Sequence, residues 1–293
     1  MNLIRIFRKM TTKISPMLAS KIMYRVKMNK RLNLKSPSTF NEKINYLKLK
    51  KYPFIKTIIN CTDKYMVREY VKNKGLENNL TKLYGCWNTS KEINFTELPN
   101  SFVLKCNHGC GYNILCKNKN NFDVENEIKK INKWMNEDFG LVSGEPHYSR
   151  IEKKIICEEY LEDDILDYKF FCFKGNPEFF YVAQNVDGDF HNMQSDFFYC
   201  DGSLADFYRT DHKRFEKLPI LPSNLKEMVK IAKILSKDFE FVRVDLFNVN
   251  GKIYFSELTF SPCSGFMPIN PEYIDFQYGK LIDLNKYIGD KYE

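Results

Sequence analysis

Several features that would assign this chain to a specialised class are scarce or missing. Nine of its 293 residues are cysteine, an odd number and too few for a disulfide scaffold of this size, so we expect a reducing, cytosolic compartment. No apolar run approaches the ~18 residues that a membrane-spanning helix needs. The basic start MNLIRIFRKM leads into no apolar core of signal-peptide length. We therefore expect a cytoplasmic protein and no secretion.

Acidic residues are also missing from the first 41 positions, where ten Lys and Arg residues stand. The formal net charge of +8 is thus +10 over residues 1–41 and −2 over the rest. Such a leader is attracted to an anionic membrane surface or a polyanionic glycan, which would place the protein at the inner membrane face. A solvated helical face is the plainer interpretation. We expect no nucleic-acid partner, because no nucleic-acid-binding module accompanies the charge.

What the chain does contain is enough apolar material for a sizeable core, with 43% hydrophobic residues, 24 Phe and 18 Tyr. The first third predicts helices. Ser15 is a cap before Pro16, with Leu18, Ile22 and Val26 recurring every four residues. Thr39 and Glu42 form a capping box before a helix that buries Phe40, Ile44 and Leu47. Thr62 and Asp63 are predicted to cap a third helix, with Met66, Val67, Tyr70 and Val71 as its buried side.

From Phe102 onward, strand patterns dominate. We predict strands over residues 102–105, 154–160, 167–173 and 178–184, interrupted by helices near 124–136 and 224–237, and a final strand pair around Asn250-Gly251. The fold class is therefore α+β rather than a regular βαβ alternation.

The final strand pair carries the first candidate site. Arg243 and Asp245 share a face of one strand, as do Glu257 and Thr259 on the next. A two-residue turn would pair Val244 with Glu257 and separate the carboxylates, whereas a three-residue loop would bring Arg243, Asp245 and Glu257 to one surface. In the second register two carboxylates could hold Mg²⁺. The alternative is an Arg–Glu pair on a solvated face.

The second candidate is FVLKCNHGCGYN at 102–113, where Lys105 ends a strand before a loop with Gly109 and Gly111. Glycine backbone amides can form an anion nest and the lysine adds a positive charge, which suits phosphates. Structural zinc on Cys106, His108, Cys110 and Cys116 is the competing interpretation, although the spacing fits no usual ligand set.

Three further segments could complete a nucleotide site. In KIICEEYLED, at 154–163, the strand turns polar at Glu158 and Glu159, and its backbone could meet an adenine edge. An edge strand with acidic gatekeepers is the simpler interpretation. Asp167 and Lys169 share a face of the next strand and could reach phosphates. In SPCSGF, at 261–266, a turn could hold a carboxylate or acyl phosphate, or could simply end the strand.

The order of these motifs resembles the ATP-grasp superfamily, and more closely its TupA-like branch of cell-wall and capsular polysaccharide biosynthesis. The likeness is carried by TFNEKINYLKL (39–49), TDKYMVREYV (62–71), FVLKCNHGCGYN, HY (147–148), KIICEEYLED, DYKFFCFKG (167–175), FVRVDLF, and YFSELTF followed by SPCSGF. It implies an ATP-grasp fold with the nucleotide between two antiparallel-rich sheets. We divide the chain into a basic helical extension, 1–60, and a catalytic core, 61–293.

The resemblance also implies roles. ATP would be bound by Lys105, His108, Gly109, Gly111, Asn113, Glu158, Glu159, Tyr160, Leu161, Asp167 and Lys169. Magnesium would be held by Asp245, Glu257 and Thr259, and catalysis would use Arg243, Lys169 and Lys105. Substrate would meet Ser261, Ser264 and Gly265, whereas Asp63 and Lys64 would be structural.

Two departures from the family pattern stand out. First, Thr259 stands where most relatives have an asparagine metal ligand, and a threonine hydroxyl is a weaker ligand for a second metal ion. Second, the first third of the chain is helical, where many relatives have an α/β domain. The resemblance implies an ATP-dependent carboxylate–amine ligase acting through an acyl phosphate, on a uronic acid or amino acid of a surface polysaccharide. A glycosyltransferase or sugar kinase of the same pathway and a non-catalytic ATP-binding protein are the alternatives.

Overall fold

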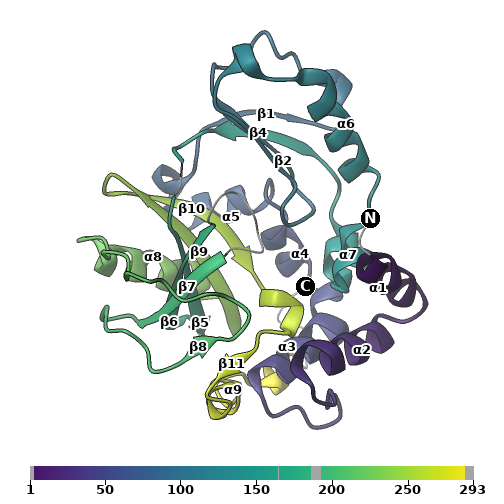
Figure 1. Ribbon diagram of the computed structural model, residues 1–293, viewed down its shortest axis with the longest axis vertical. Coiled ribbons are helices and arrows are strands. Elements are labelled where there is room, and N and C mark those ends of the chain that lie inside the picture. The colour runs from purple at the N-terminus through teal and green to yellow at the C-terminus, as the bar shows by residue number, and fades with distance from the viewer. Residues whose placement is uncertain (1–2, 164, 186–192, 288–293) are drawn as a thin grey trace.

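The computed structural model describes residues 3–163, 165–185 and 193–287 (Figure 1). Two antiparallel sheets dominate it. A four-stranded sheet lies at the top of Figure 1, a five-stranded sheet lies below it, and the N-terminal helices pack beside the lower sheet. The predicted α+β class, with two antiparallel-rich sheets and a helical N-terminus, is confirmed.

The first third of the chain is helical, as predicted. Its helices are α1 (Leu3–Ile14), α2 (Pro16–Met28), α3 (Phe40–Lys50), α4 (Lys56–Thr62) and α5 (Val67–Asn73). Ser15 caps α2, because its hydroxyl accepts a hydrogen bond from the backbone N–H of Leu18. The capping box of Thr39 and Glu42 is present at the start of α3.

Two details of these helices differ from the prediction. In α2 the buried side carries Ala19 and Met23, whereas Leu18 and Val26 are exposed. α5 begins only at Val67, because the carboxylate of Asp63 accepts hydrogen bonds from the amides of Tyr65 and Met66 and holds a turn between α4 and α5.

The four-stranded sheet has the order β1-β4-β2-β3. Its strands are β1 (Leu83–Trp87), β4 (Ile155–Glu159), β2 (Phe102–Cys106) and β3 (Asn113–Cys116). One face packs against α6 (Val124–Met135) around Phe102, Leu104 and Ile131, which belong to a separate hydrophobic core. This sheet is therefore a lobe with its own interior.

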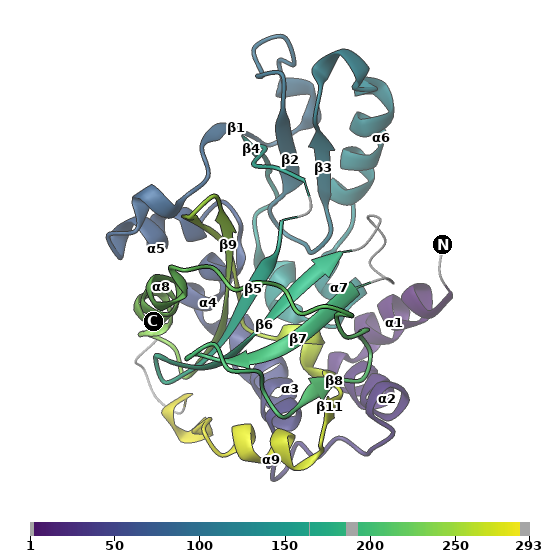
Figure 2. The same cartoon turned by 60° about the vertical axis from the view of Figure 1, so that its left-hand side comes forward.

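The five-stranded sheet has the order β10-β9-β5-β6-β7. Its strands are β10 (Lys252–Thr259), β9 (Phe241–Val249), β5 (Asp167–Phe173), β6 (Asn176–Asn185) and β7 (Met193–Tyr199). α8 (Leu225–Ser236) covers one face with the predicted stripe, of which Met228, Ala232 and Leu235 are completely buried. Figure 2 shows α8 beside this sheet.

The opposite face of this sheet changes character along the strands. At one end Phe171, Phe173 and Phe241 surround Phe40 of α3, with ring centroids 4.9–6.0 Å from its ring. At the other end the same alternation presents Lys169 and Asp245, which are directly paired across β5 and β9. Strand alternation therefore places a charged cluster beside an aromatic core.

The remaining elements close the molecule around this face. They are α7 (Phe139–Ser143), the two-stranded pair β8 (Tyr208–Arg209) and β11 (Ile269–Asn270), and α9 (Tyr273–Gly279). Because α3 lies in the core of the five-stranded sheet, helices before residue 60 contribute to that core. The boundary at residue 60 stays a prediction. None of the helices in the described ranges is both long and apolar enough to cross a membrane.

Candidate active site

The hairpin of β9 and β10 combines the predicted turn with an unpredicted bulge. Asn250 and Gly251 form a two-residue turn with φ values of 51° and 83°, and Val249 pairs with Lys252. The register then shifts between Phe255 and Glu257, because Ser256 is an extra residue on β10. Neither expected register is right: the turn has two residues, and the bulge places Glu257 opposite Asp245.

Asp245 is the centre of the charged cluster. Its side chain has no solvent exposure, and Arg243 donates to both carboxylate oxygens at 2.7 and 2.6 Å. Lys169 donates to Asp245 at 2.7 Å and also contacts Asp167. Burial lowers the pKa values of Arg243 and Lys169, but the neighbouring carboxylates outweigh it and raise both, so both side chains stay positively charged.

Glu257 is the most exposed carboxylate of the cluster, at 28% of its side chain, against 24% for Asp167 and 0% for Asp245. Arg243 approaches one of its oxygens at 3.4 Å and the Thr259 hydroxyl donates to the same oxygen at 3.1 Å. Burial raises the pKa of Glu257, but the charges of Lys64, Lys169 and Arg243 outweigh it and lower the pKa to about 2. Glu257 is therefore ionised at neutral pH.

The cluster offers the all-oxygen donor set that Mg²⁺ prefers, on two strands in direct register. Glu257 fits this use because, among the described residues, its second oxygen accepts no hydrogen bond and has Lys64 at 3.7 Å. Asp245 would become a ligand only if Arg243 or Lys169 moved away from its oxygens. Thr259 donates to Glu257 and accepts from Arg243 at 3.0 Å, so its hydroxyl is already engaged.

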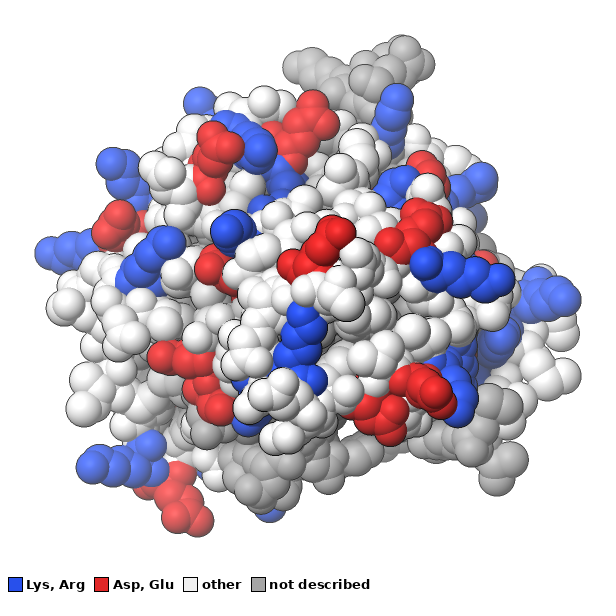
Figure 3. All heavy atoms as spheres, turned by 90° about the horizontal axis from the view of Figure 1, so that it is seen from above, with Lys and Arg blue, Asp and Glu red and all other residues white. Residues whose placement is uncertain are grey.

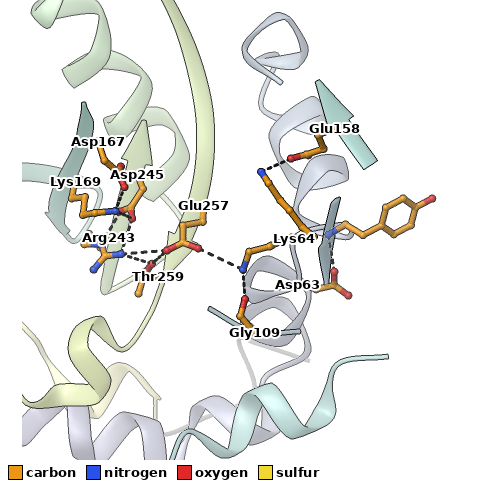
Figure 4. A network of polar contacts seen from close by, with 12 residues as sticks. Asp63, Lys64, Gly109, Glu158, Asp167, Lys169, Arg243, Asp245, Glu257 and Thr259 are labelled. Carbon is orange, nitrogen blue, oxygen red and sulfur yellow. Dashed lines mark hydrogen bonds and ion pairs between the residues drawn. The ribbon is translucent and has the colours of Figure 1, made fainter. Parts of the chain in front are cut away.

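Lys64 joins the two halves of the site and was not predicted to do so. It follows α4, and its ammonium group donates to the carbonyl of Gly109 at 2.6 Å while facing Glu257 (Figure 4). The sequence suggested a structural role for Asp63 and Lys64. That role holds for Asp63, which accepts from backbone amides, whereas Lys64 lies inside the site. Lys64 directly follows the predicted cap Asp63, and nothing in the local sequence indicated that its side chain enters the site.

Glu158 forms the second charged cluster, on the four-stranded sheet. Its carboxylate contacts Lys105 at 2.6 Å and Arg68 of α5 at 2.7 Å, and it is nearly buried. Burial raises its pKa, but the two cations outweigh it and hold the pKa below its usual range. Glu158 thus positions Lys105, and the nucleotide contact predicted for Glu158 stays a prediction. Arg68 was not predicted.

A cavity of about 620 Å³ lies between the two sheets. Five residues predicted to bind the nucleotide line it: Lys105, Asn113, Glu159, Tyr160 and Leu161. The other lining residues are Thr81, Val103, Leu115, Lys117, Glu162, Asp163, Ile165, Gln184 and Phe247. Apolar side chains from both sheets and polar groups at the rim are the composition of a site for a flat heteroaromatic ring.

The glycine-containing loop divides between this site and the protein interior. Gly111 has a φ of 74°, and Asn113 lines the cavity. His108 instead points into the lobe, where its Nε2 lies 3.1 Å from the carbonyl of Trp134, and burial lowers its pKa. Over the residues that the structure describes, no three His, Cys, Asp or Glu side chains gather as a metal site. The cysteines and histidine of the zinc alternative therefore do not form such a site.

The turn after β10 is held by a buried acid. Ser261 and Ser264 both donate to Glu145, the latter at 2.9 Å, and the carbonyl of Ser264 accepts from Lys48 at 2.6 Å. Gly265 has a φ of 77°, and a β-carbon there would lie 2.5 Å from Asn45. Both predicted substrate-binding hydroxyls are therefore engaged with Glu145, and their contact with substrate stays a prediction.

Comparison with known proteins assigns this arrangement to a family. The family described as TupA-like ATPgrasp matches residues 42–283. The chain belongs to the TupA-like ATP-grasp family. The predicted resemblance and ATP-grasp fold are thereby confirmed, and the match includes both charged clusters and the cavity. A search of curated proteins finds no match.

Solved structures with a similar fold come from several ATP-grasp enzymes. One is D-alanine–D-alanine ligase from Bacillus anthracis complexed with ATP, at 15% identity and a TM-score of 0.44, over 68% of this chain and 55% of that one. A second is N5-carboxyaminoimidazole synthetase from Staphylococcus aureus complexed with ADP, at 14% identity and a TM-score of 0.41, over 70% of this chain and 46% of that one. A third is L-amino acid ligase from Bacillus licheniformis, at 14% identity and a TM-score of 0.45, over 74% of this chain and 47% of that one. This chain spans about half the length of each.

Proposed function

We propose that the chain is an ATP-dependent ligase that joins a carboxylate to an amine. The observation that carries this proposal is the cavity between the sheets, which Lys105 lines. The five-stranded sheet beside it carries Asp245 and Glu257 in direct register, a pair of carboxylates suited to a metal ion. The adenine ring would occupy the apolar part of the cavity. The backbone of Tyr160 and Leu161 would meet its edge, with Glu159 and Asn113 at the rim.

The phosphates would extend from Lys105 toward Lys64 and the charged cluster. Glu257, with Asp245 after release of one of its cations, would hold Mg²⁺, which supplies charge neutralisation on the phosphate oxygens. Lys169 and Arg243 stay protonated and would meet the anionic groups brought together there. Positioning and electrostatic stabilisation are the main requirements of phosphoryl transfer.

The reaction has two steps. In the first, an oxygen of the substrate carboxylate attacks the γ-phosphorus of ATP, and the bond between this phosphorus and the β,γ-bridging oxygen breaks. The products are an acyl phosphate and ADP. An amine nitrogen then attacks the acyl carbon, the bond to phosphate breaks, and the amide forms with release of inorganic phosphate and a proton. Arg243 would stabilise the oxyanion of the second step.

We propose, from the resemblance to the TupA-like branch, that the carboxylate is a uronic acid or amino acid of a capsular or cell-surface polysaccharide. A polyanionic acceptor of this kind would suit the basic residues 1–41. A screen of ADP release with Mg²⁺-ATP, across uronic acids, amino acids and small amines, tests the proposal. ADP formation that requires both a carboxylate and an amine, with an amide product by mass, is expected.

Other outcomes of this screen would contradict the proposal. ADP formation without an amine, giving a sugar phosphate, would indicate a sugar kinase. Release of a nucleoside diphosphate from a sugar nucleotide would indicate a glycosyltransferase. ATP binding with no product from any pair would indicate a non-catalytic protein.

A further inference from the structure

Helix α1 directs its apolar side away from the protein. Phe7, Met10 and Ile14 are 54%, 63% and 81% exposed. Their spacing of three and four residues places them along one side of the helix, and we call these three side chains the apolar ridge. Three large apolar side chains in a row on one helix face are more than the scattered exposed residues that any protein surface carries.

The side of α1 that packs on the protein is polar instead. Thr11 and Thr12 are buried, and Arg5 contacts Glu137 and donates to the Tyr112 hydroxyl at 3.3 Å. The Nε atom of Arg8 is also buried. α1 is therefore inverted relative to α8, whose apolar stripe faces the sheet. Polar contacts hold the helix in place, and its hydrophobic side is free to contact a partner outside the chain.

The surroundings of the apolar ridge are positively charged. Lys9 and Lys13 on α1 are exposed, as are Lys21, Arg25 and Lys27 on α2, and residues 1–41 contain no acid. Figures 1 and 2 both place α1 and α2 at the outer edge of the molecule. Figure 3, the view from above, shows positive and negative side chains interspersed. The surface around the ridge complements an anionic partner.

We propose that α1 lies in the surface of an anionic lipid bilayer, with the apolar ridge at the boundary between headgroups and acyl chains. The exposed lysines and arginines of α1 and α2 would contact the lipid phosphates. A helix with apolar residues on one side and basic residues beside them is the usual form of such an anchor. A second copy of the chain is a poorer occupant, because it would bring two basic surfaces together. The inference does not depend on the ligase activity.

The experiment is co-sedimentation of the full chain with vesicles of phosphatidylcholine, with and without phosphatidylglycerol. We expect binding only when phosphatidylglycerol is present, and weaker binding as salt is raised. The variant Phe7→Ser/Met10→Ser/Ile14→Ser keeps every charge and should bind about tenfold or more weakly. Ile220→Ser is the matched control, because Ile220 is 90% exposed and lies outside the N-terminal helices. It should bind as the wild type does.

Three results would overturn the proposal. The first is equal vesicle binding by the triple variant and the wild type, which would mean that the basic residues alone bind the vesicle and the apolar ridge does not contribute. The second is no vesicle binding by the wild type. The third is a wild-type dimer in sedimentation velocity that the triple variant abolishes, which would make a second copy the occupant. If the triple variant melts at a lower temperature than the wild type, Ile14→Ser alone, at the most exposed position, replaces it in the same comparison.

Discussion

The two sheets carry charged clusters that differ in residual charge and in access to solvent. On the four-stranded sheet, Glu158 is shared by two cations, so the cluster of Arg68, Lys105 and Glu158 has a net charge of +1. On the five-stranded sheet, Lys169 and Arg243 face three carboxylates, which leaves one negative charge before Lys64 is counted. The first balance suits a phosphate and the second suits a metal ion. Lys64 lies between them.

Burial sharpens this difference. The side chains of Asp245 and Glu158 are 0% and 8% exposed, so both are held by their cations, whereas those of Glu257 and Asp167 are 28% and 24% exposed. The buried carboxylates fix the positions of Arg243 and Lys105. Of the two exposed ones, Asp167 is paired with Lys169, which leaves Glu257 as the more open to a ligand. The comparison predicts that removing a buried carboxylate changes stability first, and that removing Glu257 changes activity first.

The largest effect is expected for Asp245→Asn. It leaves Arg243 and Lys169 buried without their shared carboxylate charge, which should lower the free energy of unfolding by about 3–5 kcal/mol. Urea denaturation followed by circular dichroism measures it. Glu178→Gln, an exposed position on β6 of the same sheet, is the control and should change nothing. A loss below about 1 kcal/mol would show that the buried charges find other partners.

The next effect is on catalysis, with Glu257→Gln. Because the amide cannot bind Mg²⁺ as the carboxylate does, ADP release should fall about a hundredfold or more at a temperature where the variant is still folded. The melting temperature should also fall, because the variant loses the stabilisation that the lowered pKa of Glu257 reflects. The measurement is steady-state ADP release with whichever substrate pair the screen identifies. Retained turnover in this variant would remove Glu257 from the metal site.

A matched pair of variants separates the two partners of Glu158. Lys105 lines the cavity and Arg68 is not among the residues that line it. Lys105→Met should raise the KM for ATP about tenfold, as expected for loss of one charge-assisted hydrogen bond. Arg68→Met should lower stability and leave the KM within a few-fold of the wild type. Equal KM values in the two variants would mean that the residual charge beside the cavity has no role in binding.

The smallest effect is the pH dependence of stability. The pKa of Glu257 is lowered from 4.5 to about 2 in the folded chain. The unfolded state therefore binds more protons in this range, and the stabilisation is present above pH 4.5 and is lost as the pH falls through 2. In Glu257→Gln, the urea midpoint should change less between pH 4.5 and pH 3 than in the wild type. Parallel curves for the two proteins would contradict the lowered pKa.

Local sequence patterns predicted most of the elements and part of the site. The capping box of Thr39 and Glu42, the Asn250-Gly251 turn and the stripe of α8 each depend on residues close together in the chain, and each is present. Lys105, Tyr160 and Leu161 line the cavity because they belong to a strand and a strand end that alternation identifies. The roles of these residues in nucleotide binding stay predictions.

The errors share a physical origin in contacts between distant segments. Neither expected register of the final hairpin was right, because the bulge at Ser256 compensates for the short turn, and no residue type marks a bulge. The pairing of Glu158 with Arg68 and the engagement of Ser261 with Glu145 join residues 90 and 116 positions apart. The outward apolar face of α1 was not predicted, because a helix usually buries its hydrophobic side.

By itself, the sequence determined the α+β class and the helix starts at Ser15 and Thr39, because composition, periodicity and capping act over a few neighbouring positions. The family was indicated by the resemblance in the order of its motifs. Only the tertiary structure decided which carboxylate is buried, which one is open, and where Lys64 and the apolar ridge point. Those properties depend on burial and on charges brought together from distant parts of the chain, and burial is a property of the folded molecule.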